Sequence, residues 1–460
     1  DDSCYQDRLF LNVGGRFEYA PEALPRFLSS GSCVRAADYD RDGDLDLFVG
    51  GRVLPNEFPR PVSSYLLRNE STPERVRFSI ANADAAPFLD DFGMVCDALW
   101  TDFDNDGWTD LLLAPEWQPL TFLQNRRGTF HDLTPQTGLA EHTGWWNSLA
   151  AADLDRDGDT DYLAGNFGRN SLFQASPETP VSIYAADFDG NGGLDAVPSV
   201  FFKATDGSLQ EFPYFGRADM IKQMVAIKRR YPRYADFAVA TIEDVLPPEQ
   251  RREALQLRAT WLESAWVENL GKGRFRLHPL PLDAQTAPVY ALLAQDFTDD
   301  GRPDVLLVGN DYGVEVATGR CDALNGLLLE NQGGGSFQSL SLQESGFVVP
   351  GDAKSLVALR SARDELLLIA GQNRGPLRAF QTRTPPARWL PLQPDEWAAL
   401  LHHTDGRTER RELGYGTSFL SQSTRALPLP ATVRRVEILD FRGGKRVWEA
   451  PAGGGSALGQ

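Results

Sequence analysis

The chain carries short apolar runs that alternate with polar turns. Runs such as Cys33-Val-Arg-Ala-Ala and Ala98-Leu-Trp-Thr precede a polar loop, and runs such as Leu111-Leu-Leu and Val305-Leu-Leu-Val follow one. Short apolar runs bounded by turn residues are typical of buried β-strands. The pattern therefore predicts an all-β protein in which each of these polar loops is the turn of a hairpin.

A second turn motif begins with Asn, contains Gly and ends with Phe. It occurs at 12–17, 125–130, 269–275 and 331–337. Asn and Gly supply the positive φ that tight hairpin turns require. Two hairpins in each unit give four strands, and a four-stranded β-propeller blade takes roughly 40 to 50 residues.

Five polar loops repeat one motif, in which aspartates fall at alternate positions around a glycine. The loops span 38–46, 102–110, 153–161, 187–195 and 296–304. A further unit near 354–380 keeps an apolar strand but has lost the alternating aspartates, and we expect it to bind no metal. We predict a calcium-binding β-propeller of seven blades, with the N-terminal hairpin and later strands closing the ring.

The longest gap between loops leaves room for an insert at about 216–264. Its sequence has helical propensity and partly helical spacing, and Pro248 suits a helix start. We expect a small helical insert on one blade. The predicted domains are a propeller over 1–385 and a C-terminal β segment over 386–460 that packs on the ring or completes it.

The loop spacing matches calcium chemistry. A hard cation needs six to eight oxygen ligands on a chain that turns sharply, and glycine at the sixth position permits the turn. Positions one, three, five and nine offer side-chain oxygens, and position seven offers a carbonyl. The predicted ligands are Asp38, Asp40, Asp42, Asp44, Asp46, Asp102, Asp104, Asp106, Trp108, Asp110, Asp153, Asp155, Asp157, Asp159, Asp161, Asp187, Asp189, Asn191, Gly193, Asp195, Asp296, Thr298, Asp300, Arg302 and Asp304.

These loops give up to five calcium sites, which we interpret as structural staples. Thr298 and Asn191 stand where other loops have acids, so we expect the weakest binding in the loops at 187 and 296. Helix-loop-helix calcium sensors close their loops with Glu at position 12, and calcium solenoids need nonapeptide repeats. Neither pattern occurs in this chain.

The net charge of -19 follows from the loops, since they contain 21 aspartates and three arginines. The charge therefore indicates metal ligation and not a basic partner. Nucleic acid binding is not expected, because phosphate contacts need clustered Lys and Arg. We interpret the one basic run, 228–230, as a solvated helix face. No run of roughly 18 uncharged apolar residues suggests a transmembrane segment.

Calcium loops are useful where calcium is plentiful, so we expect a secreted or cell-surface location. The four cysteines lack metal-site spacing and permit one or two disulfides without requiring any. No hydrolase elbow, zinc-protease motif or phosphate loop occurs. A carboxylate pair from distant blades stays possible, with Glu116 and Asp311 as the candidates.

A binding face is expected where the second strands of successive units end. Aromatic and hydrogen-bonding side chains gathered there would suit a sugar or peptide ligand. The alternative is that these loops hydrogen-bond one another across a solvent channel. The residues are Arg52, Glu116, Trp117, Asn166, Arg169, Phe201, Phe202, Asn310, Asp311, Tyr312, Asn373 and Arg374. We interpret Trp145 and Trp146 as core.

The aspartate loops with their following strands resemble FG-GAP/VCBS repeats. The tail, with Gly414-Tyr-Gly-Thr-Ser-Phe-Leu-Ser-Gln and Val433-Arg-Arg-Val-Glu-Ile-Leu-Asp, is similar to the ASPIC/UnbV module of the cartilage acidic protein-like family. Segments such as Gly165-Asn-Phe-Gly-Arg-Asn resemble bacterial surface proteins of this family.

The resemblance implies a secreted or outer-membrane-anchored calcium propeller with no common catalysis. We therefore expect a non-catalytic binding or scaffold protein with a protein or glycan ligand, engaged in glycan capture or in nutrient uptake beside an outer-membrane transporter. The alternative is a carbohydrate-active enzyme of propeller fold, a hydrolase or lyase.

Overall fold

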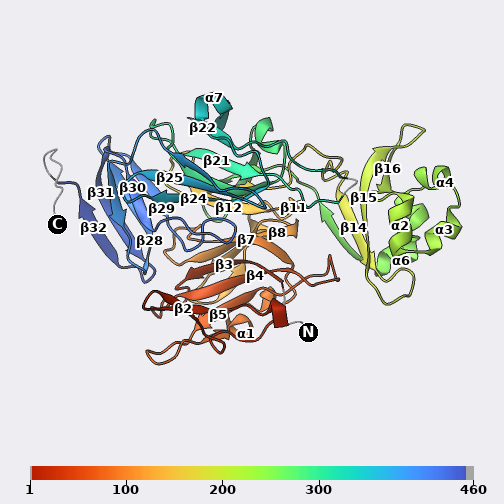
Figure 1. The fold of residues 1–460 in the computed structure, drawn as a ribbon, viewed down its shortest axis with the longest axis horizontal. Helices are drawn as coiled ribbons and strands as arrows, with labels where there is room; N and C mark the ends of the chain where they lie inside the picture. The colour runs from red at the N-terminus through yellow and green to blue at the C-terminus, as the bar shows by residue number, and fades with distance from the viewer. Residues whose placement is uncertain (1–2, 29, 316–317, 452–460) are drawn as a thin grey trace.

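The computed structural model describes residues 3–28, 30–315 and 318–451. Its described part is mostly β, with strands gathered in nine small sheets and with only short helices (Figure 1). The β-rich fold expected from the apolar runs is confirmed. The propeller and its seven blades remain a prediction.

Five sheets follow one another along the chain and pack side by side. The first sheet has β3 (Ser30–Ala37), β4 (Asp46–Val53), β5 (Tyr65–Asn69) and β6 (Phe78–Ile80), and the second has β7 (Met94–Thr101), β8 (Asp110–Gln118), β9 (Thr121–Asn125), β10 (Phe130–Asp132) and β11 (Gly144–Trp145). The third has β12 (Ser148–Ala152), β13 (Asp161–Gly165), β18 (Ala265–Asn269) and β19 (Phe275–Pro279). The fourth has β20 (Val289–Gln295), β21 (Asp304–Gly309), β22 (Leu327–Gly333) and β23 (Ser336–Leu340), and the fifth has β24 (Ala353–Arg360), β25 (Leu366–Gln372) and β26 (Arg378–Gln381).

The first strands of these sheets lie next to one another in the order β3, β7, β12, β20, β24. All five contribute to the lining of one cavity of about 190 Å³. The loop around Ser418 joins the two ends of this series. Arg35 in β3 donates to the Ser418 carbonyl at 3.4 Å, and the Leu356 amide in β24 donates to Oγ of Ser418 at 3.0 Å.

Apolar side chains fill the spaces between neighbouring sheets, because each strand alternates its side chains between two faces. Tyr39 and Trp100 pack between the first and second sheets, and Phe122 and Phe275 stack at 4.1 Å between the second and third. Trp146 belongs to the same cluster and is fully buried. Its interpretation as core is confirmed.

Every aspartate loop joins two antiparallel strands, as predicted: β3–β4, β7–β8, β12–β13, β14–β15 and β20–β21. The Asn-to-Phe motif also forms hairpins throughout, at β1–β2, β9–β10, β18–β19 and β22–β23. However, among the described residues β1 (Phe10–Val13) and β2 (Arg16–Tyr19) pair only with each other. The expectation that this hairpin closes the ring is not met, because neither strand joins another sheet.

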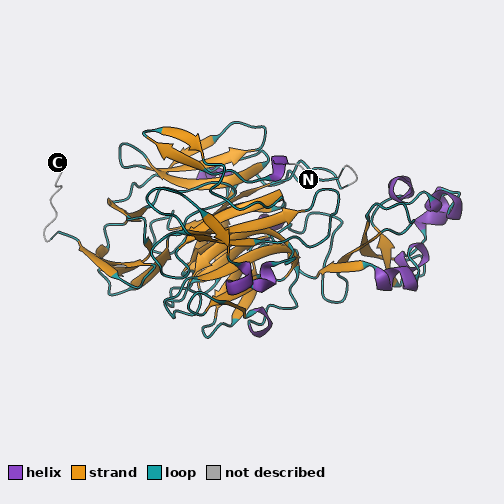
Figure 2. Ribbon diagram, turned by 90° about the horizontal axis from the view of Figure 1, so that it is seen from below, coloured by secondary structure: helices purple, strands orange, loops and turns teal. Residues whose placement is uncertain are grey.

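A separate lobe is inserted between β13 and β18 of the third sheet. Its sheet has β14 (Val181–Ala186), β15 (Asp195–Lys203), β16 (Leu209–Pro213) and β17 (Leu255–Ala259). Its helices are α2 (Arg217–Gln223), α3 (Ala226–Arg230), α4 (Tyr234–Ala238), α5 (Ile242–Val245) and α6 (Pro248–Glu253), so a helix begins at Pro248 as predicted. The lobe projects at the right of both ribbon views (Figures 1 and 2). The loop at 187–195 therefore belongs to the lobe and not to the five packed sheets.

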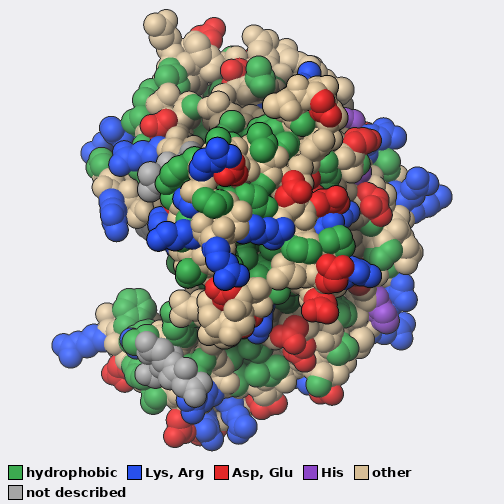
Figure 3. Space-filling model, turned by 90° about the vertical axis from the view of Figure 1, so that its right-hand side faces the viewer, with side chains coloured by type: hydrophobic (Ala, Val, Ile, Leu, Met, Phe, Trp, Pro, Cys, Tyr) green, Lys and Arg blue, Asp and Glu red, His purple; other side chains and the backbone are tan. Residues whose placement is uncertain are grey.

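The face on the lobe side of the molecule mixes Lys and Arg side chains with hydrophobic ones (Figure 3). The basic run 228–230 is exposed at the end of α3, while Ile227 before it is buried against Met220 and Met224. This arrangement fits the interpretation of the run as a solvated helix face.

The C-terminal strands form a module at the left of Figure 1. One sheet pairs β27 (Arg388–Pro391) with β30 (Ala426–Leu429), and the other has β29 (Thr408–Glu412), β28 (Glu396–His403), β31 (Val433–Asp440) and β32 (Lys445–Glu449). The remaining helices are α1 (Asn82–Ala85), α7 (Leu342–Ser345) and the 3₁₀ turns Ser3–Tyr5, Pro87–Leu89, Thr134–Gln136 and Leu282–Gln285. Within the described residues, no helix has the length and apolarity that a bilayer crossing requires.

Candidate metal centres

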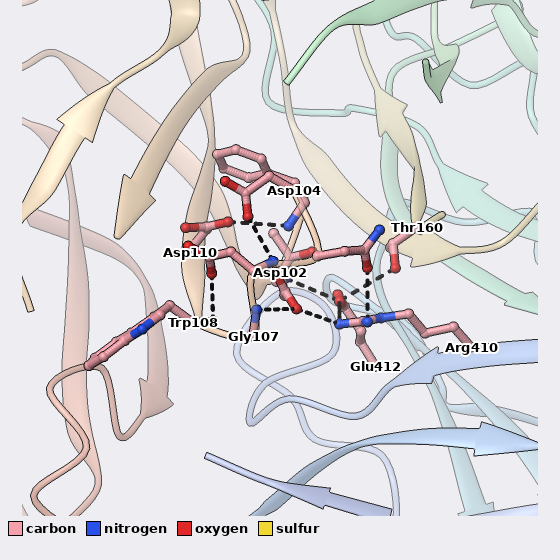
Figure 4. A network of polar contacts seen from close by, with 12 residues as sticks. Asp102, Asp104, Gly107, Trp108, Asp110, Thr160, Arg410 and Glu412 are labelled. Atoms are coloured by element: carbon pink, nitrogen blue, oxygen red, sulfur yellow. Dashed lines mark hydrogen bonds and ion pairs between the residues drawn. The ribbon is translucent and has the colours of Figure 1, made fainter. Parts of the chain in front are cut away.

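The aspartate loops fold by hydrogen bonds between their own carboxylates and backbone amides. In the loop at 102–110, Gly107 donates to Asp102 at 3.2 Å, Asp106 to Asp104 at 3.1 Å and Trp108 to Asp106 at 2.7 Å. Gly107 has φ of 87°, in the left-handed region that glycine adopts without strain. The chain thereby wraps around the space that Asp102, Asp104 and Asp110 face (Figure 4).

Four of the loops bring three carboxylates together, with one oxygen of each within 4.8 Å of the others. The groups are Asp38, Asp40 and Asp42; Asp102, Asp104 and Asp110; Asp153, Asp155 and Asp161; and Asp187, Asp189 and Asp195. Such sets of hard oxygen donors could hold a metal ion. In each of these four loops, three of the predicted acids come together, while the other predicted ligands remain a prediction.

Three loops also contain buried carboxylate oxygens that no protein donor reaches. Oδ1 of Asp38, Oδ1 of Asp102 and both oxygens of Asp153 lack a hydrogen-bond partner, although these side chains are almost fully buried. A buried charged oxygen without a partner costs several kcal/mol or shifts its pKa instead. Burial raises the pKa of each of these three carboxyls to about 6. A bound divalent cation would satisfy these oxygens, so the residues present fit a metal ion.

The ninth residue of each loop also accepts hydrogen bonds from backbone amides. Oδ1 of Asp110 accepts from the Asn125 amide at 2.7 Å, and Oδ2 accepts from the Phe103 amide at 3.2 Å. Burial raises the pKa of Asp46 and Asp161, the equivalent residues, to about 8. In the loops at 38, 102, 153 and 296 the ninth acid accepts from the backbone amide of an Asn in the third strand of the unit, whereas Asp195 accepts from Phe188 within its own loop.

The loops at 187 and 296 differ from the other three. Asp187 and Asp189 are exposed, and backbone amides, led by that of Gly192, lower the pKa of Asp187. In the loop at 296–304, the Thr298 hydroxyl donates to Asp304 at 3.0 Å, and Arg302 forms an ion pair with Asp300. These protein contacts occupy oxygens that a cation would need, which supports the expectation of weaker binding at both loops.

Three asparagines each link the aspartate loop of their own sheet to that of the preceding packed sheet. Nδ2 of Asn125 donates to the carbonyls of Tyr39 and Thr109 at 2.8 and 3.0 Å, so one side chain holds two loops. Asn269 joins Phe103 to Thr160, and Asn331 joins Leu154 to Pro303, in the same way. The Asn of the second motif was expected to serve only its own turn. Its role between sheets could have been found from the recurrence of the motif after the aspartate loops at 102, 153 and 296.

Three arginines of the C-terminal module contact three different aspartate loops. Nη2 of Arg410 donates to Asp102 at 2.9 Å (Figure 4), Nη1 of Arg407 donates to the Gly301 carbonyl at 2.8 Å, and Nη2 of Arg442 donates to the Asp42 carbonyl at 3.0 Å. Glu412 joins the same network, because it accepts from the Asp102 amide at 3.1 Å. Sequence reasoning missed these residues, since no motif surrounds them.

At the other ends of the strands, several residues of the expected binding face meet in a cluster of charges, the distal cluster. Arg52 and Glu116 form an ion pair at 2.7 Å, and the Tyr290 hydroxyl donates to Asp311 at 2.7 Å. Lys354 lies 3.3 Å from the centre of the Tyr290 ring and pairs with Asp352 at 2.9 Å, and Asn373 donates to the same Asp352 at 3.1 Å. These contacts link the first sheet to the second and the fourth sheet to the fifth.

Other residues of the expected face do not present their side chains to solvent. Trp117 is 5% exposed and packs edge-on against Trp145. Asn166 and Asn310 are fully buried, because their amides hold neighbouring loop carbonyls at Trp261 and Leu324. We expected these three side chains to bind a ligand, but Trp117 packs in the interior, and Asn166 and Asn310 hold neighbouring loops in place.

The remaining face residues lie near the surface. Arg169 pairs with Glu263 at 3.2 Å beside the lobe, and Phe201 and Phe202 lie in β15 of the lobe itself. Tyr312 is 38% exposed and has the Arg320 guanidinium over its ring, and Arg374 is exposed.

Residues 102–164 match the family model described as the FG-GAP-like repeat. The match contains the two aspartate loops at 102–110 and 153–161, and FG-GAP repeats often bind calcium. The comparison with curated proteins finds no match.

Among solved structures, the chain is similar to the crystal structure of the V. cholerae biofilm matrix protein Bap1, with 12% sequence identity and a TM-score of 0.26. The similarity covers 91% of this chain and 59% of that one, so the chain spans less than two thirds of the length of that protein.

Proposed function

We propose that this chain is a non-catalytic binding or scaffold module whose fold is stabilised by calcium. The observation that carries the proposal is the set of buried carboxylate oxygens of Asp38, Asp102 and Asp153 that lack protein partners. They lie in loops that also hold neighbouring sheets together. A cation at these positions stabilises the folded state because the unfolded chain offers no such site.

Calcium fits these loops better than magnesium does. The loops offer carboxylates and carbonyls on an irregular turn, which suits the flexible coordination of six to eight oxygens around calcium. Magnesium demands near-ideal octahedral geometry and keeps several waters. Since such loops need abundant calcium, we propose a secreted or cell-surface location.

The finer architecture is part of the same proposal. The five packed sheets, each with its first strand on the shared cavity, support a β-propeller. We keep the proposal of seven blades, of which five correspond to the packed sheets. The C-terminal module is proposed to be of the ASPIC/UnbV type.

The distal cluster and its surroundings are the proposed ligand face. Half-exposed Arg52 with exposed Tyr312 and Arg374 combine an aromatic ring with hydrogen-bond donors, a combination that suits a glycan. A glycan captured there could be passed to an outer-membrane transporter, which is the partner that we propose.

The test is capture of surface glycans by the wild type and by the variant Arg52→Ala/Tyr312→Ala/Arg374→Ala. We expect the variant to lose capture while it stays folded, with a modest fall in melting temperature because Arg52 no longer pairs with Glu116. Trp117 is left intact because it is buried. The matched control is Tyr234→Ala/Arg363→Ala/Arg434→Ala, which removes three exposed side chains elsewhere. Equal capture by wild type and variant contradicts the face, and cleavage of the captured glycan contradicts the non-catalytic assignment.

A further inference from the structure

The hairpin β1–β2 has the geometry of the outer hairpin of a complete unit. Asn12 pairs across the hairpin with Phe17, as Asn125 pairs with Phe130 in β9–β10. Asn269 with Phe275 and Asn331 with Phe337 repeat this register. The Gly15 amide donates to the side chain of Asn12 at 3.0 Å, as Gly128 does to Asn125 at 2.7 Å. All four hairpins therefore pair Asn with Phe, and β1–β2 shares its turn with β9–β10.

The surroundings of the four hairpins differ. In the second sheet, β9 pairs with β8, and this contact leaves Asn125 fully buried and Phe130 only 4% exposed. In β1–β2, by contrast, Phe17 is 77% exposed and Asn12 is also exposed. Phe10 and Tyr19 on the same hairpin are about half exposed, at 50% and 49%.

A two-stranded hairpin with unpaired edges is at best marginally stable in water. Unpaired amides and carbonyls along an edge strand form a template for another strand. The aromatic side chains add apolar surface that complete units bury. Both features are explained if the hairpin lacks the inner half of its unit.

We infer that β1–β2 is the outer half of a repeat unit and that the edge of β1 is the docking site for an aspartate-loop hairpin. The occupant is a pair of antiparallel strands joined by a loop of the kind found at 102–110. Its second strand would pair with β1 as β8 pairs with β9. Its ninth-position carboxylate would accept from the Asn12 amide, as Asp110 accepts from Asn125, and Phe17 would become buried.

The five aspartate-loop hairpins of this chain cannot be this occupant, because each already lies in its own sheet. In three complete units the ninth-position aspartate precedes its asparagine by 23, 15 and 27 residues. The occupant is therefore an aspartate-loop hairpin that the sheets of the described residues do not already contain.

The test rebuilds the missing half from the chain's own sequence. Residues 94–120 contain β7, the aspartate loop and β8, and they end directly before Thr121, the residue that aligns with Arg8. Fusion of a copy of 94–120 directly ahead of Arg8, in place of 1–7, should complete the unit. A scrambled copy of equal length and composition is the matched control.

We expect hydrogen exchange of the β1 and β2 amides to slow by roughly tenfold or more in the fusion, because the edge becomes paired. One additional calcium ion should bind. The peptide 94–120 added in trans should protect the same amides, and this second measurement does not depend on folding of the fusion. The inference is overturned if neither form protects β1, or if the scrambled copy protects it equally. It is also overturned if the unmodified chain already protects β1 in proportion to protein concentration, since a second copy would then be the occupant.

Discussion

Nη2 of Arg410 lies 2.9 Å from Oδ2 of Asp102, although the two residues are 308 positions apart in the sequence. Both side chains are largely buried, and Glu412 lies against the same guanidinium at 3.4 Å. The C-terminal module therefore supplies a positive charge to the first acid of a candidate calcium site. Arginine and cation compete for the negative charge of one carboxylate.

The variant Arg410→Gln should separate these two roles. Without calcium, we expect the free energy of unfolding to fall by about 3 kcal/mol, because the buried Asp102 loses its ionic partner. The gain in melting temperature on adding calcium should be larger than in the wild type, since the cation no longer competes with the guanidinium. Calorimetry with and without calcium measures both effects. Arg435→Gln, at an exposed pair with Glu437, is the control. A smaller calcium response in Arg410→Gln would show that the arginine organises the site instead.

Removal of calcium should lower the melting temperature markedly. Each site with calcium at a hundred times its Kd contributes about 2.7 kcal/mol to the folded state. Asp153→Asn should remove one bound ion and lower the melting temperature in calcium but not in chelator, because Asp153 faces the cluster with both oxygens unpartnered. Asp299→Asn, at an exposed loop position, should change neither value. Elemental analysis and calorimetry give the two readouts. An unchanged melting temperature of the wild type in chelator would refute the structural role of the metal.

Asn125→Ala should destabilise the protein by about 2 to 4 kcal/mol. The side chain satisfies the buried carbonyls of Tyr39 and Thr109, and each unsatisfied group costs about 1 to 3 kcal/mol. Asn12→Ala is a closely matched control, since Asn12 occupies the same motif position but is exposed, and we expect a loss below about 0.5 kcal/mol. Urea unfolding measures both. Equal losses for the two variants would mean that the link between sheets contributes little.

Stability without calcium should fall as pH rises from about 5 to 8. In the folded state, the pKa of Asp102 and Asp153 is about 6 and that of Asp46 and Asp161 about 8, against 3.8 as the ordinary value. The folded chain thus binds more protons than the unfolded chain in this window. The resulting stabilisation is complete below about pH 4 and is lost as pH rises through the folded-state pKa values. Melting temperatures measured across this range in chelator test the sign. With calcium bound, the slope should vanish or reverse, because the cation favours the ionised carboxylates.

Much of the local structure could be predicted from the sequence. Alternating aspartates around Gly43 or Gly107 specify a turn and its oxygen donors, and the apolar runs beside them specify strands. These signals are local, since they depend on neighbours within about ten residues. They therefore located the hairpins and four clusters of acids.

The same signals could not say which sheet a hairpin joins. The loop at 187–195 looks like the others but lies in the inserted lobe, because sheet membership depends on contacts far along the chain. The burial of Trp117 and the contact of Arg410 with Asp102 have the same origin. Neither residue carries a local pattern that distinguishes it from an exposed tryptophan or arginine.

The lobe leaves the third sheet after β13 and returns at β18, and Ala164 and Ala265 face each other directly across that ladder. The points where the chain leaves β13 and re-enters at β18 are therefore separated only by the spacing between two neighbouring strands. A lobe inserted at this position can therefore leave the register of the surrounding strands unchanged. The position behaves as an insertion site, where a separate sheet and its helices are added to the scaffold without a change in its strand order.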